Sequence, residues 1–244
     1  MKRLQITRMA VIKENPTTVP PVGTVTDDRI DITGAQNEGR DWLEENQKLI
    51  VAIVGGLIAI AAGIFLYRTF VQAPAQAEAS EQMWRAQQQF ERDSFNLALL
   101  NPAPGFMGFV DIASEYGSTP AGNLAKYYAG VSYLRLGQYD AAIDYLEDYD
   151  EDGEILPATK AGVLGDAYAQ KGDFDAAANH YEDAVDKSDD NLVLAPYYMQ
   201  KLALLHERQG DKAAANALYT RIQQEYPTST QAGDIDKYIL RTAS

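Results

Sequence analysis

Three stretches of the sequence resemble one another at a spacing that few architectures use. They are AGVSYLRLGQYDAAIDYL from Ala129, LGDAYAQKGDFDAAANHYEDA from Leu164 and LALLHERQGDKAAANALYTRI from Leu202. A glycine recurs at the same place in each stretch, at Gly137, Gly172 and Gly210, so the spacings are 35 and 38 residues. Such a period indicates stacked copies of one supersecondary unit, which cannot bury its apolar face alone.

Small residues within the stretches predict that each unit is a pair of helices. The small positions of the first helix are Gly130, Gly165 and Ala203, and those of the second are Ala142, Ala177 and Ala215. Leu146, Tyr181 and Tyr219 follow four residues later and would fill the space between the helices. The recurring glycines can adopt the left-handed conformation that ends a first helix. A helix–turn–helix unit with a period near 34 is the signature of the tetratricopeptide repeat.

Segments on either side of the three repeats predict caps. A helix over about 77–100, with Met83, Trp84, Phe90 and Leu97 as its apolar positions, ends at NPAPG, and a short helix follows that ends near Gly117. Together they would form a linker helix and a degenerate first repeat over 69–122. The three repeats then occupy 123–244, which closes with a helix that places Ile235, Tyr238 and Ile239 on one face. We therefore expect an all-α solenoid of about four helix pairs plus a capping helix.

An uncharged run, LIVAIVGGLIAIAAGIFLY, occupies residues 49–67. Nineteen helical residues span about 28 Å, close to the hydrocarbon thickness of a bilayer. The alternatives are a buried core helix and a signal peptide cleaved near Ala75-Gln76-Ala77. Core helices are usually shorter and interrupted, and signal peptides start within the first residues of a chain. We therefore predict a juxtamembrane segment and one transmembrane helix over 41–68, retained as a signal anchor.

The residues before this run predict a flexible arm on the cytoplasmic side. Pro16, Pro20 and Pro21 interrupt any helix in the arm, and its few apolar residues cannot offset chain entropy. Residues 1–48 hold seven Lys and Arg, against three in residues 68–92, namely Arg68, Arg85 and Arg92. This bias favours a cytoplasmic N-terminus and a C-terminal domain outside the cytoplasm. The arm, over 1–40, would be a spacer or a docking peptide for a cytoplasmic partner.

Composition excludes several classes of function. Residues 69–244 carry 13 Lys and Arg against 27 Asp and Glu, so the domain repels phosphate backbones and a nucleic-acid partner is not expected. The chain has no cysteine, which excludes disulfides, thiol catalysis, cysteine metal sites and lipoprotein anchoring.

No pattern of an enzyme, a cofactor site or a metal site is found. The acidic run over 144–155 does not fit a calcium loop, so we expect a solvated turn, with contact to a cation or a basic partner as the alternative. His206 occupies a packing or groove-lining position, and His180 is expected at the solvated surface.

A protein-binding groove is the predicted site. In this class of repeat the first helix of each pair lines the concave face. The candidates by register are Tyr127, Val131, Leu134 and Arg135, then Asp166, Ala169 and Gln170, then Tyr197, Gln200, Leu204, Glu207 and Arg208. This mixed aromatic and polar set suits an extended or helical segment of another protein. It lacks the basic cluster that would clamp a terminal carboxylate.

The apolar run carries a second candidate contact. Ala52, Gly56, Ala59 and Gly63 are spaced 4, 3 and 4 residues apart, which places small residues on one helical face. Small faces let transmembrane helices approach closely. The partner would be either a second copy, giving a homo-oligomer, or a helix of another membrane protein.

The sequence also resembles a known family over residues 49–244. The resemblance is carried by the single anchor ahead of the repeats, by FERDSFNLAL, by EYGSTPAGNLAKYYAG, by GDAYAQKGDFDAAANHYEDA and by EYPTSTQAGDIDKYI. These segments are similar to the YfgM-like tetratricopeptide proteins, above all to their Bacteroidota-type members.

The resemblance implies a single-pass protein of the bacterial inner membrane with periplasmic repeats. It implies an ancillary subunit of the Sec translocon, with translocon subunits, periplasmic chaperones or client segments as partners. A cell-envelope or cell-division scaffold that uses the same groove is the alternative.

Overall fold

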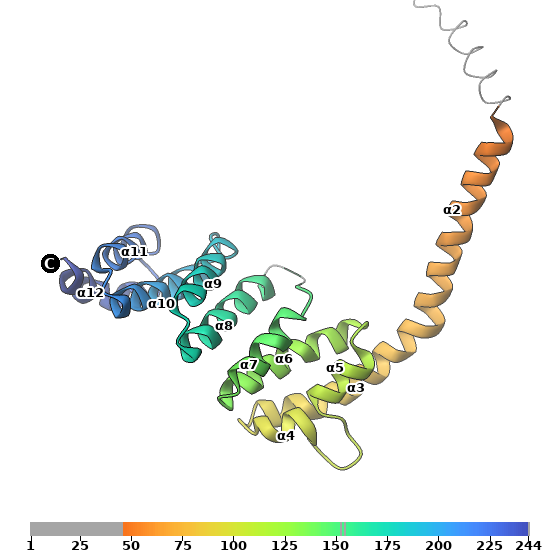
Figure 1. Ribbon diagram of the computed structural model, residues 1–244, viewed down its shortest axis with the longest axis horizontal. Coiled ribbons are helices and arrows are strands. Elements are labelled where there is room, and N and C mark those ends of the chain that lie inside the picture. Colours follow the sequence, from red (N-terminus) through yellow and green to blue (C-terminus); the bar gives the residue numbers. More distant parts are fainter. Residues whose placement is uncertain (1–45, 152, 154, 244) are drawn as a thin grey trace, which may run out of the picture. The chain divides into compact units, whose positions relative to one another are not determined.

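The computed structural model describes residues 46–151, 153 and 155–243 (Figure 1). The predicted arm over 1–40 lies outside these residues. The described chain is helical and contains no strand, apart from an isolated bridge between Ala103 and Phe106. The predicted all-α class is therefore confirmed. Residue contacts divide the chain into two units, 1–60 and 61–244, and all helix pairs belong to the second.

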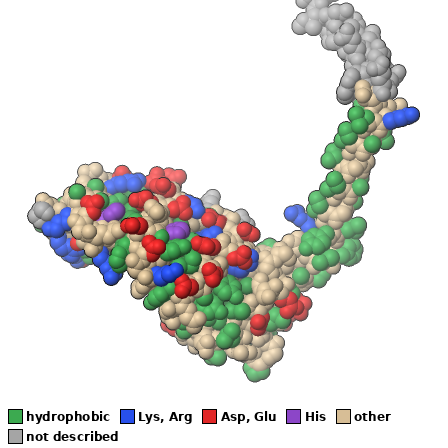
Figure 2. Space-filling view, in the orientation of Figure 1, with side chains coloured by type: hydrophobic (Ala, Val, Ile, Leu, Met, Phe, Trp, Pro, Cys, Tyr) green, Lys and Arg blue, Asp and Glu red, His purple; other side chains and the backbone are tan. Residues whose placement is uncertain are grey.

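A long helix begins the described chain. It consists of α2 (Gln47–Tyr67), a π-helical turn (Arg68–Gln72) and α3 (Ala73–Phe90). None of the residues of α2 is buried, and their side chains give the helix a largely hydrophobic surface (Figure 2). In the part of the chain that the structure describes, this is the one helix long and apolar enough to cross a membrane, judged by length and composition.

Three helix pairs follow the predicted repeats. They are α6 (Pro120–Arg135) with α7 (Tyr139–Glu147), α8 (Leu156–Lys171) with α9 (Phe174–Asp186), and α10 (Leu194–Gln209) with α11 (Lys212–Glu225). Each pair packs against the next along the chain (Figure 1). A 3₁₀ turn (Gln231–Asp234) then leads into α12 (Ile235–Thr242), which packs on α11.

The glycines predicted to end the first helices are left-handed in the structure. Gly137, Gly172 and Gly210 have φ of 75°, 88° and 87°. The predicted close crossings are also present: a Cβ on Gly130 would lie 2.6 Å from Leu146 Cγ, and one on Gly165 would lie 2.6 Å from Tyr181 Cδ1. The helices of a pair therefore approach too closely at these two glycines to accommodate a side chain.

The degenerate first repeat departs from its prediction. The helix expected to run to about residue 100 ends at Phe90, and α4 (Phe95–Leu100) and α5 (Phe109–Tyr116) follow separately. Asp93 is left-handed (φ 57°), and Ser94 N donates to Gln89 O at 2.9 Å, which closes the helix end. Two of the predicted apolar positions, Trp84 and Leu97, are exposed by 55% and 48%, whereas Met83 is buried.

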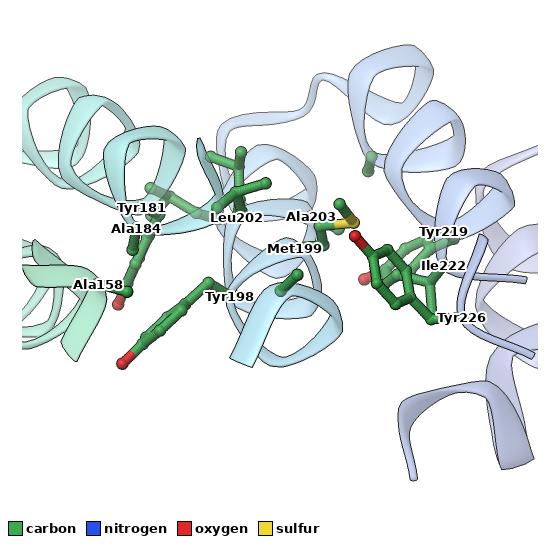
Figure 3. Close-up of a cluster of buried hydrophobic side chains, with 14 of the residues drawn as sticks. Ala158, Tyr181, Ala184, Tyr198, Met199, Leu202, Ala203, Tyr219, Ile222 and Tyr226 are labelled. Carbon is green, nitrogen blue, oxygen red and sulfur yellow. The ribbon is translucent and has the colours of Figure 1, made fainter. Parts of the chain in front are cut away.

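The buried side chains form three clusters along the solenoid. The largest joins α8 to α12 around Tyr181, Tyr198, Met199, Tyr219 and Ile222 (Figure 3). Another joins α3 to α6 around Met83, Leu99 and Phe109. Between them lies a small cluster of four buried residues, namely Ile143, Leu146, Leu164 and Ala167. The solenoid therefore has two well-packed halves and a thinner joint between α7 and α8.

Candidate functional site

A hollow of about 700 Å³ lies on the first helices of the three pairs, α6, α8 and α10. Eleven residues line it: Val131, Leu134, Arg135, Leu136, Gly137, Tyr139, Val163, Asp166, Gln170, Tyr197 and Lys201. We call this hollow the groove. The structure thus brings together six of the residues predicted from register, from three helices that are distant in the sequence.

Asp166 and Lys201 form the polar centre of the groove. Lys201 Nζ lies 2.5 Å from Asp166 Oδ1 and 2.7 Å from Oδ2, which ties α10 to α8. The Tyr181 hydroxyl donates to Asp166 Oδ1 at 2.6 Å. Burial and the adjacent carboxylate both raise the pKa of Tyr181, so its hydroxyl keeps the proton that it donates. The ammonium of Lys201 also lies 4.9 Å from the Tyr197 ring centroid.

The rim of the groove carries a positive charge without an ion-pair partner among the described residues, and exposed apolar side chains. Arg135 is exposed at the end of α6, and within the described residues its guanidinium makes no hydrogen bond or ion pair. Leu136 and Tyr197 are exposed by 38% and 40%. The groove can therefore offer a visiting segment a guanidinium, an aromatic face and an aliphatic contact, while the charges of Asp166 and Lys201 satisfy each other.

Other predicted site residues have structural partners elsewhere. Tyr127 is half-buried and packs on Tyr149 with ring centroids 5.6 Å apart, so it does not line the groove. The carboxylate of Glu207 accepts hydrogen bonds from Tyr219 Oη and Arg241 Nη2, each at 2.6 Å. Arg208 places its guanidinium 4.5 Å from the Phe174 ring centroid.

Three further candidates also lie outside the groove lining. Ala169 is partly buried against the cluster that joins α8 to α12, Gln200 is half-buried, and Leu204 is 44% exposed on α10. Register therefore predicts more residues than the groove lining contains.

Comparison with known proteins supports this architecture. A model of the tetratricopeptide repeat matches residues 110–154 and 163–230. These helix pairs are tetratricopeptide repeats. The match begins within α5 and covers most of α6 to α11, the helices that carry the groove. A search of curated proteins gives no match to the sequence. Tetratricopeptide repeats point to a protein–protein interaction scaffold, a class that is typically non-catalytic.

The two histidines of the tetratricopeptide repeats are both half-buried. The prediction of a solvated His180 is wrong, because its ring stacks on Tyr168 with centroids 5.0 Å apart and is half-buried. Burial lowers the pKa of His180, and Lys187 and Lys160 lower it further, against the opposing effect of Asp183 and Glu147. His206 is half-buried on α10. Among the described residues, no three His, Asp or Glu side chains are placed to hold a metal ion.

The small face predicted in α2 is open. Ala52, Gly56, Ala59 and Gly63 are all exposed. A Cβ on Gly56 or Gly63 would meet no atom within 4 Å. A second helix could therefore approach the backbone here, and the contact remains a prediction.

Proposed function

We propose that this protein is a membrane-anchored, non-catalytic scaffold whose groove holds an extended or helical segment of another protein. The observation that carries the proposal is the convergence of Arg135, Tyr197 and the Asp166–Lys201 pair on one hollow of tetratricopeptide repeats. A segment with an apolar side chain and a carboxylate would place the first against Leu136 and Tyr197 and the second on Arg135.

Attachment to a membrane would allow a groove of low affinity to be effective. We propose that α2 crosses the bacterial cytoplasmic membrane with the repeats on the periplasmic side, supported by its length, its composition and the basic bias of the residues before it. Tethering raises the local concentration of the repeats at the membrane surface, so even a modest affinity would keep partners occupied there.

We further propose which proteins this scaffold associates with at the membrane. The resemblance to YfgM-like proteins supports an ancillary role at the Sec translocon, in which the repeats link the channel to periplasmic chaperones or to emerging client segments. The small face of α2 would contribute a contact within the membrane, because Gly56 and Gly63 leave room for a neighbouring helix.

The test is crosslinking in native membranes, followed by mild detergent extraction and mass spectrometry of what accompanies the tagged full chain. Translocon subunits and periplasmic chaperones are expected with the wild type. Arg135→Ala combined with Tyr197→Ala should reduce chaperone or client recovery by about tenfold if the groove supplies the contact. Trp84→Ala combined with Glu91→Gln is the matched control, because both residues are exposed outside the groove.

Two results would contradict the proposal. The first is partner recovery that is unchanged both in the groove variant and in a variant that combines Gly56→Leu with Gly63→Leu. It would mean that neither the groove nor the small face of α2 supplies the contact. Division or peptidoglycan enzymes in place of translocon subunits would keep the scaffold and replace its partner, giving a cell-envelope scaffold. Far-ultraviolet circular dichroism of each variant would show whether the repeats remain folded.

A further inference from the structure

A second surface lies at the starts of α8 and α10, separate from the groove. Ile155 directly precedes α8 and Val193 directly precedes α10, each 17 residues ahead of the glycine that ends the helix. They are therefore equivalent positions in consecutive repeats. Ile155, Leu192 and Val193 are exposed by 56%, 65% and 70%, among the most exposed large apolar side chains of the repeats. We call these three residues, with Asp186 and Asp190, the α8–α10 edge.

Helix stability does not account for apolar residues at these positions. The residue before a helix is preferably Ser, Thr, Asp or Asn, because its side chain can accept a hydrogen bond from the first turn. Thr119, Asp173 and Asp211 do this for α6, α9 and α11. Ile155 and Val193 make no such bond, and Asn191 Oδ1 accepts from Val193 N and Leu194 N instead. The two apolar side chains therefore neither cap a helix nor fill the core.

A hollow of about 620 Å³ adjoins the edge and is lined by three of its residues, Ile155, Asp186 and Asp190, together with the apolar side chains of Pro157 and Leu194. Asp189 also lines it; Asp189 and Asp190 come from the loop that connects α9 to α10, and Asp186 ends α9. A contact here could bury apolar surface next to carboxylates.

The uncompensated charge of the edge is negative. Lys187 also lines the hollow, but its ammonium is paired with Glu151 and Asp183, each at 3.0 Å. Asp189 is paired with Arg221 at 3.0 Å. Asp186 and Asp190 make no ion pair within the described residues. Asp186 is the last residue of α9, where a carboxylate is unfavourable with respect to the helix dipole. Helix stability therefore does not account for a carboxylate at this position.

We propose that the α8–α10 edge binds a segment of another protein in which apolar side chains alternate with Lys or Arg. The apolar side chains would cover Ile155, Leu192 and Val193, and the cations would neutralise Asp186 and Asp190. The field of the whole domain acts in the same direction, since residues 69–244 carry 27 Asp and Glu against 13 Lys and Arg. This surface is independent of the groove, so either proposal can fail alone.

The test uses the full chain in nanodiscs of zwitterionic phosphatidylcholine, with empty nanodiscs as the blank. The probe is a fluorescent helical peptide of leucine and lysine, followed by anisotropy. Peptides with glutamate in place of lysine, or serine in place of leucine, are the comparators. The leucine–lysine peptide should bind, and both comparators should bind at least about tenfold more weakly.

Variants then locate the contact. Leu192→Ser with Val193→Ser should weaken binding by about tenfold or more. Asp186→Asn with Asp190→Asn should weaken binding and flatten its dependence on salt concentration. Trp84→Ser and Glu91→Gln should leave binding unchanged, because they alter an exposed apolar side chain and an exposed carboxylate elsewhere on the domain.

Three outcomes would overturn the proposal. The first is no binding of the leucine–lysine peptide above the blank, and the second is binding that the edge variants do not alter. The third is a concentration-dependent dimer of the chain that the edge variants abolish while the peptide does not bind, which would make a second copy the occupant. Circular dichroism of the variants separates these outcomes from loss of fold, since all the substituted side chains are exposed.

Discussion

Gly165 shows how strongly single residues constrain this solenoid. An added Cβ would lie 2.6 and 2.7 Å from Tyr181 Cδ1 and Cε1. The ring cannot easily move away, because Tyr181 is buried and its hydroxyl is bonded to Asp166. Gly165→Ala should therefore destabilise by about 1–2 kcal/mol, since overpacking outweighs the gain in helix propensity.

The measurement for Gly165→Ala is the urea midpoint of the full chain in detergent. Gly233→Ala is the control, because a Cβ there meets nothing within 4 Å. A midpoint for Gly165→Ala at or above that of the wild type would show that α9 can shift away from α8 without cost.

His180 gives the domain a pH dependence of known sign. Because burial lowers the pKa of His180 in the folded chain, the unfolded chain takes up the proton first as the pH falls through about 6.5. Stability should therefore decline from about pH 7 down to the lower pKa of the folded state. His180→Phe keeps a ring on Tyr168 and cannot titrate, so its Tm should fall less between about pH 7.5 and 5.5. An equal fall in both proteins would assign the loss to carboxylates.

At the scale of elements, α12 serves as the cap that a solenoid needs at its end. Ile235 is buried against the last pair, and Asn216 Nδ2 donates to Ile239 O and to Thr242 Oγ1, each at 2.9 Å. Arg241 adds its ion pair with Glu207 on α10. The cap therefore joins both helices of the last pair.

Truncating the buried side chain that holds α12 on the last pair should destabilise only the neighbouring helices. Ile235→Ala should cost about 2–4 kcal/mol at the C-terminal end, because a fully buried side chain leaves a cavity. Amide hydrogen exchange should speed up in α10, α11 and α12 and stay unchanged in α6 and α7, since repeats contact only their neighbours. Leu240→Ala, at a side chain that is 76% exposed, is the control. Faster exchange throughout the repeats would mean that the solenoid unfolds as one unit.

The elements also show which features the sequence can predict. Close crossings at Gly130 and Gly165 and left-handed turns at Gly137, Gly172 and Gly210 follow from the steric limits on side chains, so local sequence predicts them. The end of α3 depends on Asp93 adopting a left-handed conformation that many sequences avoid. Lys201 was missed because its partner, Asp166, belongs to the preceding pair, and such contacts depend on the twist between pairs.

At the scale of the whole repeat domain, the joint between α7 and α8 is the thinnest part of the core. Only Ile143, Leu146, Leu164 and Ala167 form its buried cluster. Tyr127, Leu134, Val163 and Tyr168 are partly buried against it. Exposed polar links also cross the joint, among them Lys171 to Asp140 at 2.6 Å and Tyr168 Oη to Glu147 at 3.3 Å. Exposed ion pairs contribute little to stability, so these few apolar contacts largely couple the two halves.

Leu164→Ala should therefore uncouple the halves before it unfolds either of them. The substitution removes apolar contact from a side chain that is 5% exposed, at a cost of about 2–4 kcal/mol. We expect thermal unfolding followed by circular dichroism to change from one transition into two. Hydrogen exchange should assign one transition to α3–α7 and the other to α8–α12. Leu204→Ala, at a side chain on α10 that is 44% exposed, is the control. The groove itself crosses this joint, with Arg135 on α6 and Tyr197 on α10. A segment held between them should restore a single transition in Leu164→Ala, whereas a partner that binds one half alone would leave the two transitions separate.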